Sequence, residues 1–220
     1  MGTGTWQLRT DDRFLLLYYI TDRTQFSGSE AQRCRHLLVK VREVVAAGVD
    51  YIQLREKDLP GRQLEQLACE VVDTVRRSRS KTRVLLNSRT DVALAIGADG
   101  VNLRSRDISP LEVRRIWQAA GSTGEPVVAA SCHSEEEVRS AKFAGADFAV
   151  FGPVFEKGGT AGVGITALRA ACAHGIPVFA LGGLTLENAR SCLACGAAGV
   201  AGIRLFQRGD LEDIVRRLRH

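Results

Sequence analysis

The sequence predicts a single-domain α/β protein of the (β/α)8 TIM-barrel class, and a pattern that occurs four times is the main reason. Gly48-Val-Asp-Tyr-Ile, Gly97-Ala-Asp-Gly-Val, Gly145-Ala-Asp-Phe-Ala and Gly196-Ala-Ala-Gly-Val each follow an Ala-rich helical segment and begin an apolar run. Gly is a natural residue to end a helix, because it adopts a left-handed conformation without strain. The four glycines are 49, 48 and 51 residues apart (97−48, 145−97 and 196−145). Half of that interval, about 25 residues, is the length of one strand and one helix.

Apolar segments between the repeats supply the remaining strands. These strands are predicted at residues 14–20, 83–87, 126–130 and 177–180, and the helices that follow them at residues 31–46, 91–96, 135–143 and 186–194. With the repeats, this makes eight strands and eight helices. Continuous apolar runs such as Val84-Leu85-Leu86 are typical of parallel strands covered on both faces. An open doubly wound sheet is the alternative, but regular repetition to an eighth strand favours a closed barrel.

The chain is expected to form one domain, because no Pro-, Gly- or Ser-rich linker divides it. Residues 1–13 are predicted to be a polar N-terminal extension, and residues 14–220 the barrel. The extension lacks the apolar core of a secretory signal, and the apolar segment at 14–20 is too short to span a membrane. We therefore expect a cytoplasmic protein with no membrane partner.

Composition narrows the class of ligand. The formal net charge is +5 and aromatic residues make up only 6% of the chain, so a basic surface interleaved with aromatic side chains, as in single-strand binders, is not expected. We predict no nucleic-acid partner and favour an anionic small molecule. Six cysteines in such a chain are most simply reduced thiols. The spacing of Cys192 and Cys195 has no second pair to complete a metal site.

The segment Gln53-Leu54-Arg55-Glu56-Lys57 places four polar or charged side chains at the end of a buried strand. Arg and Lys side by side suit a phosphate or diphosphate, since Arg offers a fork of donors and Lys a compact charge. The alternative is a solvated loop. The barrel favours the first interpretation, because active sites of this fold lie at the C-terminal ends of the strands.

Glycines follow the seventh and eighth strands, where this fold commonly builds a phosphate site from bare backbone N–H groups. The residues concerned are Gly182, Gly183, Gly202, Ile203 and Arg204. The predicted ligand is therefore phosphorylated.

Three further residues at strand ends are candidates for chemistry or binding. His133 lies two residues beyond the predicted fifth strand, and a histidine there can carry a proton near neutral pH. The alternative is that His133 has no catalytic role and is only a polar residue next to the N-terminus of the following helix. Asn87 ends an apolar strand, where it binds a ligand or forms a turn. Asp107 precedes Ser109-Pro110, a predicted helix cap and first helical residue, and it can belong to that loop alone.

Taken together, these motifs resemble the thiamine phosphate synthase/TenI superfamily, and the likeness runs from about residue 18 to residue 206. The motifs that carry it are Gln53-Leu-Arg-Glu-Lys57, Asn87, Ala98-Asp-Gly-Val101, Ser131-x-His133, Gly152-Pro-Val-Phe155 and Ala180-Leu-Gly-Gly183. The resemblance implies a synthase that joins a pyrimidine diphosphate to a thiazole phosphate, releasing pyrophosphate with the help of Mg²⁺. It implies that the diphosphate is bound by Gln53, Arg55, Lys57, Asn87 and Ser131. It also implies a thiazole-phosphate site at Gly183 and near Ile203 and Arg204.

Several positions depart from the synthase pattern. Ser88 stands where synthases have an Asp that binds Mg²⁺, which leaves Asp107 as the one matching metal carboxylate. Mg²⁺ prefers hard oxygen ligands, so one carboxylate makes a poorer site. The Lys at the end of the loop after Phe155 is missing, and Arg204 replaces a Ser.

With these departures, the sequence is similar to that of the TenI branch of the superfamily. Members of this branch aromatise a carboxythiazole phosphate by proton transfer without a metal. Our leading hypothesis is a tautomerase of this kind, with His133 as proton carrier and no cofactor. The second hypothesis is a divergent thiamine phosphate synthase that uses Asp107 and Mg²⁺. A third is a non-catalytic binder of thiamine-type phosphates. Barrels of this kind often pair, so a homodimer is left open, as is a lid formed by residues 156–163.

Overall fold

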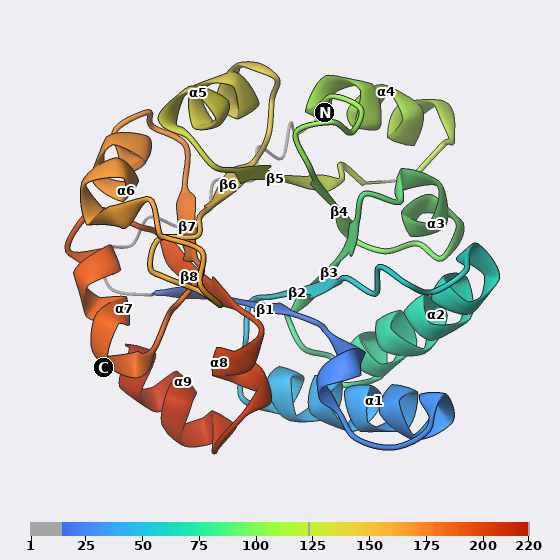
Figure 1. Ribbon diagram of the computed structural model, residues 1–220. Helices are drawn as coiled ribbons and strands as arrows, with labels where there is room; N and C mark the ends of the chain where they lie inside the picture. Colours follow the sequence, from blue (N-terminus) through green and yellow to red (C-terminus); the bar gives the residue numbers. More distant parts are fainter. Residues whose placement is uncertain (1–14, 123, 220) are drawn as a thin grey trace.

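The computed structural model describes residues 15–122 and 124–219, and these form a closed barrel of eight parallel strands in sequential order (Figure 1). The predicted fold class is therefore confirmed. The strands are β1 (Leu16–Ile20), β2 (Tyr51–Leu54), β3 (Arg83–Asn87), β4 (Gly100–Leu103), β5 (Val127–Cys132), β6 (Phe148–Phe151), β7 (Val178–Leu181) and β8 (Gly199–Gly202). The predicted extension at 1–13 lies outside the described residues, and the domain boundary stays a prediction.

Helices surround the barrel as the repeat predicts. They are α1 (Glu30–Ala46), α2 (Gly61–Arg77), α3 (Thr90–Ala95), α4 (Pro110–Ala119), α5 (Glu135–Phe143), α6 (Gly164–Cys172), α7 (Leu186–Leu193), α8 (Arg204–Gln207) and α9 (Leu211–Arg219), with the 3-10 turn η1 (Arg23–Gln25) after β1. Two features differ from the prediction. Strand β5 continues to Cys132, so His133 follows it directly. A short helix, α8, precedes the last helix, since the chain turns at once after β8.

The repeated pattern has a structural cause in both its glycine and its aspartate. The four glycines have φ values of +77°, +65°, +85° and +94° and end helices as predicted. The carboxylate of Asp50 accepts a hydrogen bond from the backbone N–H of Leu17 at 2.8 Å. Asp99 and Asp147 do the same for Val84 and Val128, at 2.8 and 2.7 Å. Each aspartate therefore ties the start of its own strand to the start of a neighbouring strand.

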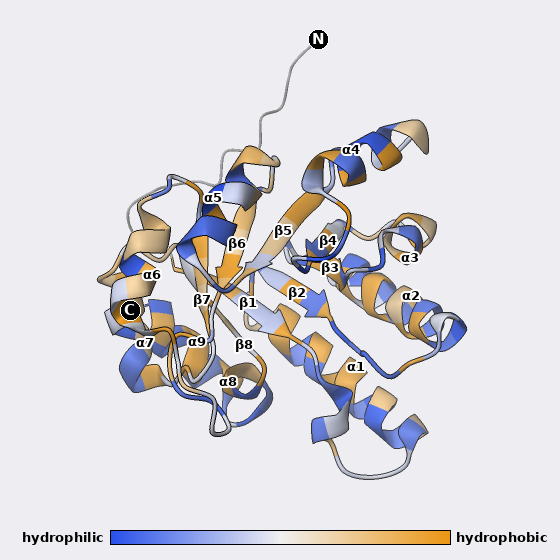
Figure 2. Ribbon diagram, turned by 45° about the horizontal axis from the view of Figure 1, so that its top comes forward, coloured by the Kyte–Doolittle hydropathy of each residue, from blue (hydrophilic) through white to orange (hydrophobic). Residues whose placement is uncertain are grey.

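Two apolar layers hold the barrel. Inside it, Tyr18, Tyr51, Phe148 and Phe179 contact one another with ring centroids 4.8–5.9 Å apart. Outside it, aliphatic side chains of the strands pack against the helices, and Figure 2 shows the alternation of hydrophobic and hydrophilic residues along them. Because these side chains fill the interior, the barrel is not an open channel. A binding site is therefore expected at its C-terminal mouth.

Local capping signals fix where helices begin near that mouth. Ser109 caps α4 and exchanges hydrogen bonds with Glu112, and Pro110 is the first helical residue, as predicted. Ser134 caps α5 and Thr185 caps α7. Among the described residues no helix is long and apolar enough to cross a membrane, and the cytoplasmic location stays a prediction.

Candidate active site

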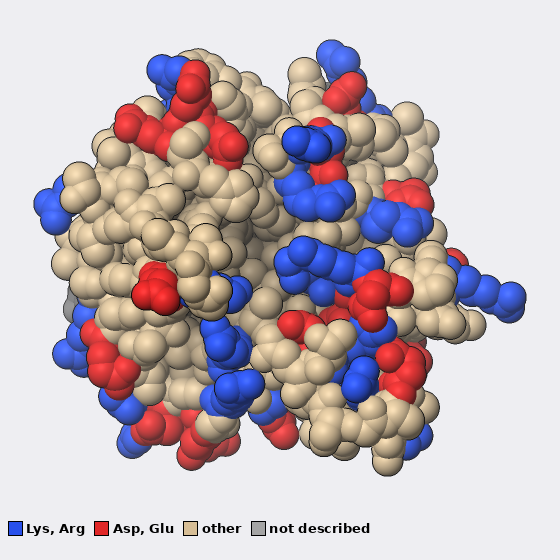
Figure 3. Space-filling model, viewed as in Figure 1, with Lys and Arg blue, Asp and Glu red and all other residues tan. Residues whose placement is uncertain are grey.

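Most of the predicted site residues lie at the C-terminal mouth of the barrel in two groups, and Ser131 and His133 lie apart from these, at the end of β5. One group follows β7 and β8, and the other follows β2, β3 and β4, which lie across the closed barrel from them. Figure 3 looks onto this mouth and shows Lys and Arg side chains on both sides of a central hollow. Each side therefore offers positive charge to an anionic ligand.

On the first side, a cavity of about 360 Å³ brings together the predicted phosphate residues. Its walls include Gly182, Gly183, Gly202, Ile203 and Arg204, together with Gln25, Lys157 and Thr185. The volume suits a phosphate with a small ring attached. Gln25 and Thr185 were not predicted from the sequence, because Gln25 comes from η1 after β1 and Thr185 from the start of α7.

Gly182 and Gly183 are required by the shape of this cavity. Their φ values are +95° and +63°, which side chains rarely adopt. A Cβ atom on Gly182 would lie 2.5 Å from the Cα of Pro153, and one on Gly183 would lie 2.6 Å from the carbonyl oxygen of Glu156. The backbone here therefore packs against the loop after β6, and the cavity keeps a wall without side chains.

The loop after β6 is a hairpin that supplies Lys157 to the cavity. Lys157 and Thr160 form an antiparallel bridge, with backbone hydrogen bonds of 3.0 and 3.1 Å. Gly158 and Gly159 between them have positive φ values, as a two-residue turn of this type needs. Burial, Arg204 and Arg55 lower the pKa of Lys157. Lys157 therefore lies within electrostatic range of both sides of the mouth.

On the second side, a chain of hydrogen bonds links β2, β3 and the loop after β4. Gln53 donates to the side-chain oxygen of Asn87 at 2.9 Å, and the Asn87 amide donates to the Ser88 hydroxyl at 3.2 Å. Ser88 has a φ of +63°, a conformation that costs a residue other than Gly about 1 kcal/mol or more. Its N–H donates to the Asn102 carbonyl at 3.0 Å. The chain orients the Asn87 amide and holds Ser88 beside Asp107.

Asp107 ends this chain in an ion pair. It accepts hydrogen bonds from the Arg104 backbone N–H at 2.7 Å and from the Arg104 guanidinium at 3.1 Å. Partial burial pushes the pKa of Asp107 upward, but the hydrogen bonds from Ser88 and Arg104 outweigh this and hold it below its usual value. Both carboxylate oxygens therefore already have partners.

A third chain lies in the barrel interior. Tyr18 donates to Asn102 at 3.3 Å, and Asn102 donates to the Ser131 hydroxyl oxygen at 2.9 Å. Because that oxygen is the acceptor, the Ser131 hydrogen is left to point elsewhere. Arg104, Asp107 and Ser131 also line a second cavity, of about 540 Å³, where β4 and β5 meet α4 and α5.

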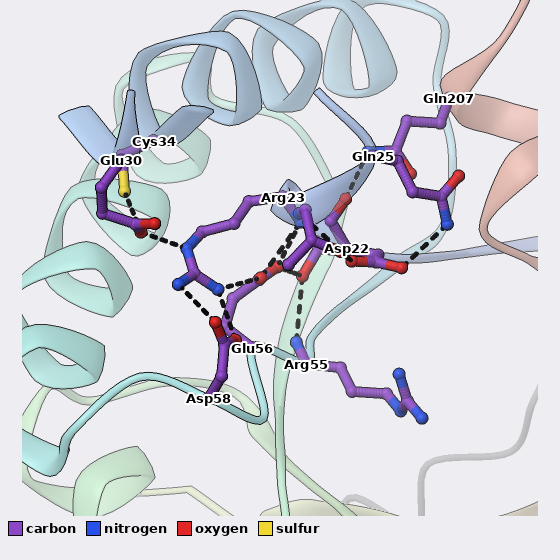
Figure 4. A network of polar contacts seen from close by, with 11 residues as sticks. Asp22, Arg23, Gln25, Glu30, Cys34, Arg55, Glu56, Asp58 and Gln207 are labelled. Atoms are coloured by element: carbon purple, nitrogen blue, oxygen red, sulfur yellow. Dashed lines mark hydrogen bonds and ion pairs between the residues drawn. The ribbon is translucent and has the colours of Figure 1, made fainter. Parts of the chain in front are cut away.

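A buried ionic network holds the segment that carries Arg55 and Lys57 (Figure 4). The Arg23 side chain is 2% exposed and pairs with Glu56 at 3.1 Å, with Asp58 at 2.7 Å and with Glu30. Glu56, whose side chain is 1% exposed, also accepts from the Thr21 hydroxyl at 2.5 Å. In Figure 4 the Arg55 guanidinium points away from this network. Glu56 is therefore structural, while its two cationic neighbours are left for the mouth.

Positive charge is concentrated around Lys57. Arg55 is the largest cause of its lowered pKa, followed by burial and Arg104. Burial lowers the pKa of Arg55 as well, and Arg104 adds to the effect. Each of these cations repels the others and makes their protonated forms less favourable. An anion bound among them would offset this repulsion.

His133 lies at the rim between β5 and β6, outside the walls of both cavities. Its ring Nδ1 is 2.6 Å from the carbonyl oxygen of Gly152. A carbonyl only accepts hydrogen bonds, so Nδ1 carries the hydrogen and a neutral ring has its lone pair on Nε2. The backbone N–H of His133 donates to Glu137 at 2.6 Å. The ring is thus fixed in one tautomer, with Nε2 able to take up a proton.

The residues present do not fit the Mg²⁺ that the synthase resemblance implies. Mg²⁺ takes one or two carboxylates along with substrate phosphates. Here Ser88 stands where synthases have an Asp that binds Mg²⁺, and both carboxylate oxygens of Asp107 accept hydrogen bonds from Arg104. Across residues 15–122 and 124–219, no three His, Cys, Asp or Glu side chains form a group that could hold a metal ion. All six cysteines are free thiols.

The closed barrel and the cation-rich cavity define a TIM-barrel protein suited to an anionic small molecule, and comparisons with known proteins give its family. The family model described as thiamine monophosphate synthase matches residues 17–206. A Geobacter sulfurreducens protein named "Putative thiamine-phosphate synthase" is 43% identical over 192 residues, which are 84% of this chain and 83% of that protein. The thiamine-phosphate synthase of Moorella thermoacetica is 33% identical over 91% of this chain and 93% of its own.

A solved structure is similar as well. The thiamine phosphate pyrophosphorylase of Pyrococcus furiosus superposes with a TM-score of 0.76 at 30% identity, covering 93% of this chain and 94% of that one. The chain belongs to the thiamine phosphate synthase superfamily and is an enzyme of thiamine biosynthesis. The resemblance seen in the sequence is confirmed at this level.

Proposed function

We propose that this enzyme is a thiazole tautomerase that aromatises a carboxythiazole phosphate by proton transfer and needs no metal. The observation that carries the proposal is that Asp107, the one carboxylate that matches a synthase Mg²⁺ ligand, already accepts hydrogen bonds from Arg104 on both of its oxygens. Moving a proton between two atoms of one substrate needs a base and a phosphate anchor, and no divalent cation.

His133 is the proposed proton carrier. Its Nε2 takes a proton from one atom of the substrate and returns it to another, so the product has the same composition as the substrate. The hydrogen bond from Nδ1 to Gly152 keeps Nε2 as the reacting nitrogen through the cycle. The phosphate would be held at Gly182, Gly183, Gly202 and Arg204, with Lys157 above it.

The test is the rate of aromatisation of the dihydrothiazole carboxylate phosphate by the purified protein in EDTA. A His133→Gln variant is expected to lose roughly 100-fold or more in rate, because general acid–base catalysis contributes at least that factor. His36→Gln, an exposed histidine on α1, is the matched control and should keep the wild-type rate. A wild-type rate no greater than that of the uncatalysed reaction contradicts the proposal.

A second candidate is a thiamine phosphate synthase, which the names of the relatives favour. In this case Gln53, Arg55, Lys57, Asn87 and Ser131 would bind the diphosphate, and Asp107 would have to release Arg104 to take Mg²⁺. Adding Mg²⁺, pyrimidine diphosphate and thiazole phosphate distinguishes the two. Formation of thiamine phosphate that EDTA abolishes would select the synthase, and binding without turnover in either assay would indicate a non-catalytic binder.

A further inference from the structure

Arg104 is an exposed cation with a fixed partner at the mouth of the barrel. Its side chain is 61% exposed, while that of Asp107 is only 12% exposed. The Asp107 carboxylate is held by the Arg104 backbone N–H at 2.7 Å and by the Ser88 hydroxyl. The Arg104 guanidinium donates to the same carboxylate through Nη2 at 3.1 Å and Nε at 3.5 Å, and Arg104 also lines the wall of the 540 Å³ cavity. Arg104 is thus oriented from one side and open to a ligand on the other.

The surroundings of Arg104 carry an excess of positive charge. Arg55 and Lys57 lie within electrostatic range of it. Of the nearby carboxylates, Glu56 and Asp58 bind Arg23 on the far side of the segment, and Asp22, which also acts on Arg55 and Lys57, accepts hydrogen bonds from Thr24 and Gln25. Those that line the cavity from α5 are also engaged: Glu136 pairs with Arg139, and Glu137 accepts from the His133 backbone. One anionic group would balance this cluster.

We propose that Arg104, braced by Asp107, determines substrate specificity by binding the carboxylate of the substrate. The phosphate would lie across the mouth, in the cavity beside β7 and β8. A planar guanidinium suits a carboxylate because it donates two parallel hydrogen bonds. This inference rests on the proposed function, whose substrate carries both a carboxylate and a phosphate. A ligand with two anions on one small ring would match the two cationic sides of the mouth.

The test compares the affinities of two probes by calorimetric titration of the full-length protein, with no turnover needed. The probes are the aromatic carboxythiazole phosphate and the same thiazole phosphate without its carboxylate. The wild type is expected to bind the carboxylated probe roughly tenfold more tightly. Arg104→Gln should remove most of that preference and leave the affinity for the other probe unchanged. Asp107→Asn should weaken the preference in the same direction, since Arg104 loses its brace.

Arg106→Gln is the matched control, an exposed arginine of the same loop, and it should keep the full preference. If Arg104→Gln does not fold, as judged by circular dichroism, Arg104→Lys takes its place, because it keeps the charge and loses the two-pronged contact. An undiminished preference in the variant, or an equal loss for both probes, overturns the proposal. So does an effect seen only with a pyrimidine diphosphate as third probe. Failure of the His133 test would refute the tautomerase and leave this affinity comparison valid.

Discussion

Glu56 and its neighbours in the segment after β2 show how one stretch of chain can serve the core and the ligand together. Successive residues of an extended segment point to opposite sides. Glu56 therefore turns inward to Arg23 and Thr21, while Arg55 and Lys57 remain at the mouth. The Arg55 backbone N–H also donates to the Thr21 hydroxyl at 3.0 Å. The inward contacts thus set the direction of the outward ones.

Replacing Glu56 with Gln is expected to destabilise the protein by about 3 kcal/mol, the lower end for breaking a buried ion pair. The lower end applies because Arg23 keeps Asp58 and Glu30 as partners. Urea unfolding measures the effect. Glu65→Gln, on the exposed face of α2, should change stability by less than about 0.5 kcal/mol. Equal effects of the two substitutions would show that the network contributes nothing specific.

The sequence indicated the two cations of this segment and missed the role of Glu56. Charge next to charge at a strand end is visible in a sequence, but the partner of Glu56 is 33 residues away, in η1. Asn102 was missed as a linking residue for a similar reason, because its partners Tyr18 and Ser131 come from other strands. The tautomer of His133 is likewise fixed by Gly152, which lies 19 residues further on. Contacts of this kind follow from barrel closure and not from local pattern.

The loop after β7 is the element most constrained by the phosphate cavity. Gly183→Ala is expected to lower affinity for thiazole phosphate roughly tenfold or more, because its Cβ would lie 2.6 Å from the Glu156 carbonyl oxygen and displace the loop. Calorimetric titration measures this. Gly145→Ala is the control: its φ is +85° but nothing lies within 4 Å of the added Cβ. That variant should lose about 1 kcal/mol of stability and keep its affinity.

If Gly145→Ala weakens phosphate binding as much as Gly183→Ala, the effect is one of general stability. The loop would then have no special part in the cavity.

Helices and strands were predictable where the repeated glycine-containing pattern shows where a helix ends and a strand begins. Helix-ending glycines and apolar runs located all eight strands to within a few residues, since each unit repeats the same local chemistry. Helix α8 was not predicted, because its four residues carry no periodicity of their own. The end of β5 was placed too early, at Ala130, since Ser131 and Cys132 read as loop residues although both continue the strand. The hairpin at Lys157 reads from the sequence only as a Gly-rich loop.

The arrangement of charge over the whole mouth makes ligand binding depend on pH. Lys57 and Lys157 have pKa values lowered from the usual 10.5, mainly by Arg55 for the first and by burial for the second. Only the protonated lysines attract an anion, so affinity must fall as the pH rises through these lowered pKa values. At the acid end, a phosphate monoester takes its second charge near pH 6. Affinity is therefore highest between these two limits.

Calorimetric titrations with thiazole phosphate from pH 7 to pH 10 should show affinity declining before the pH at which an ordinary lysine loses its proton. In that alkaline range binding should also take up protons from the buffer, because the bound anion raises the pKa values of both lysines. A variant with Lys57→Gln and Lys157→Gln together should bind more weakly and lose this pH dependence. An alkaline decline that persists in the variant would assign it to other groups. The lowered pKa values of Lys57 and Lys157 would then not be the cause of the pH dependence of binding.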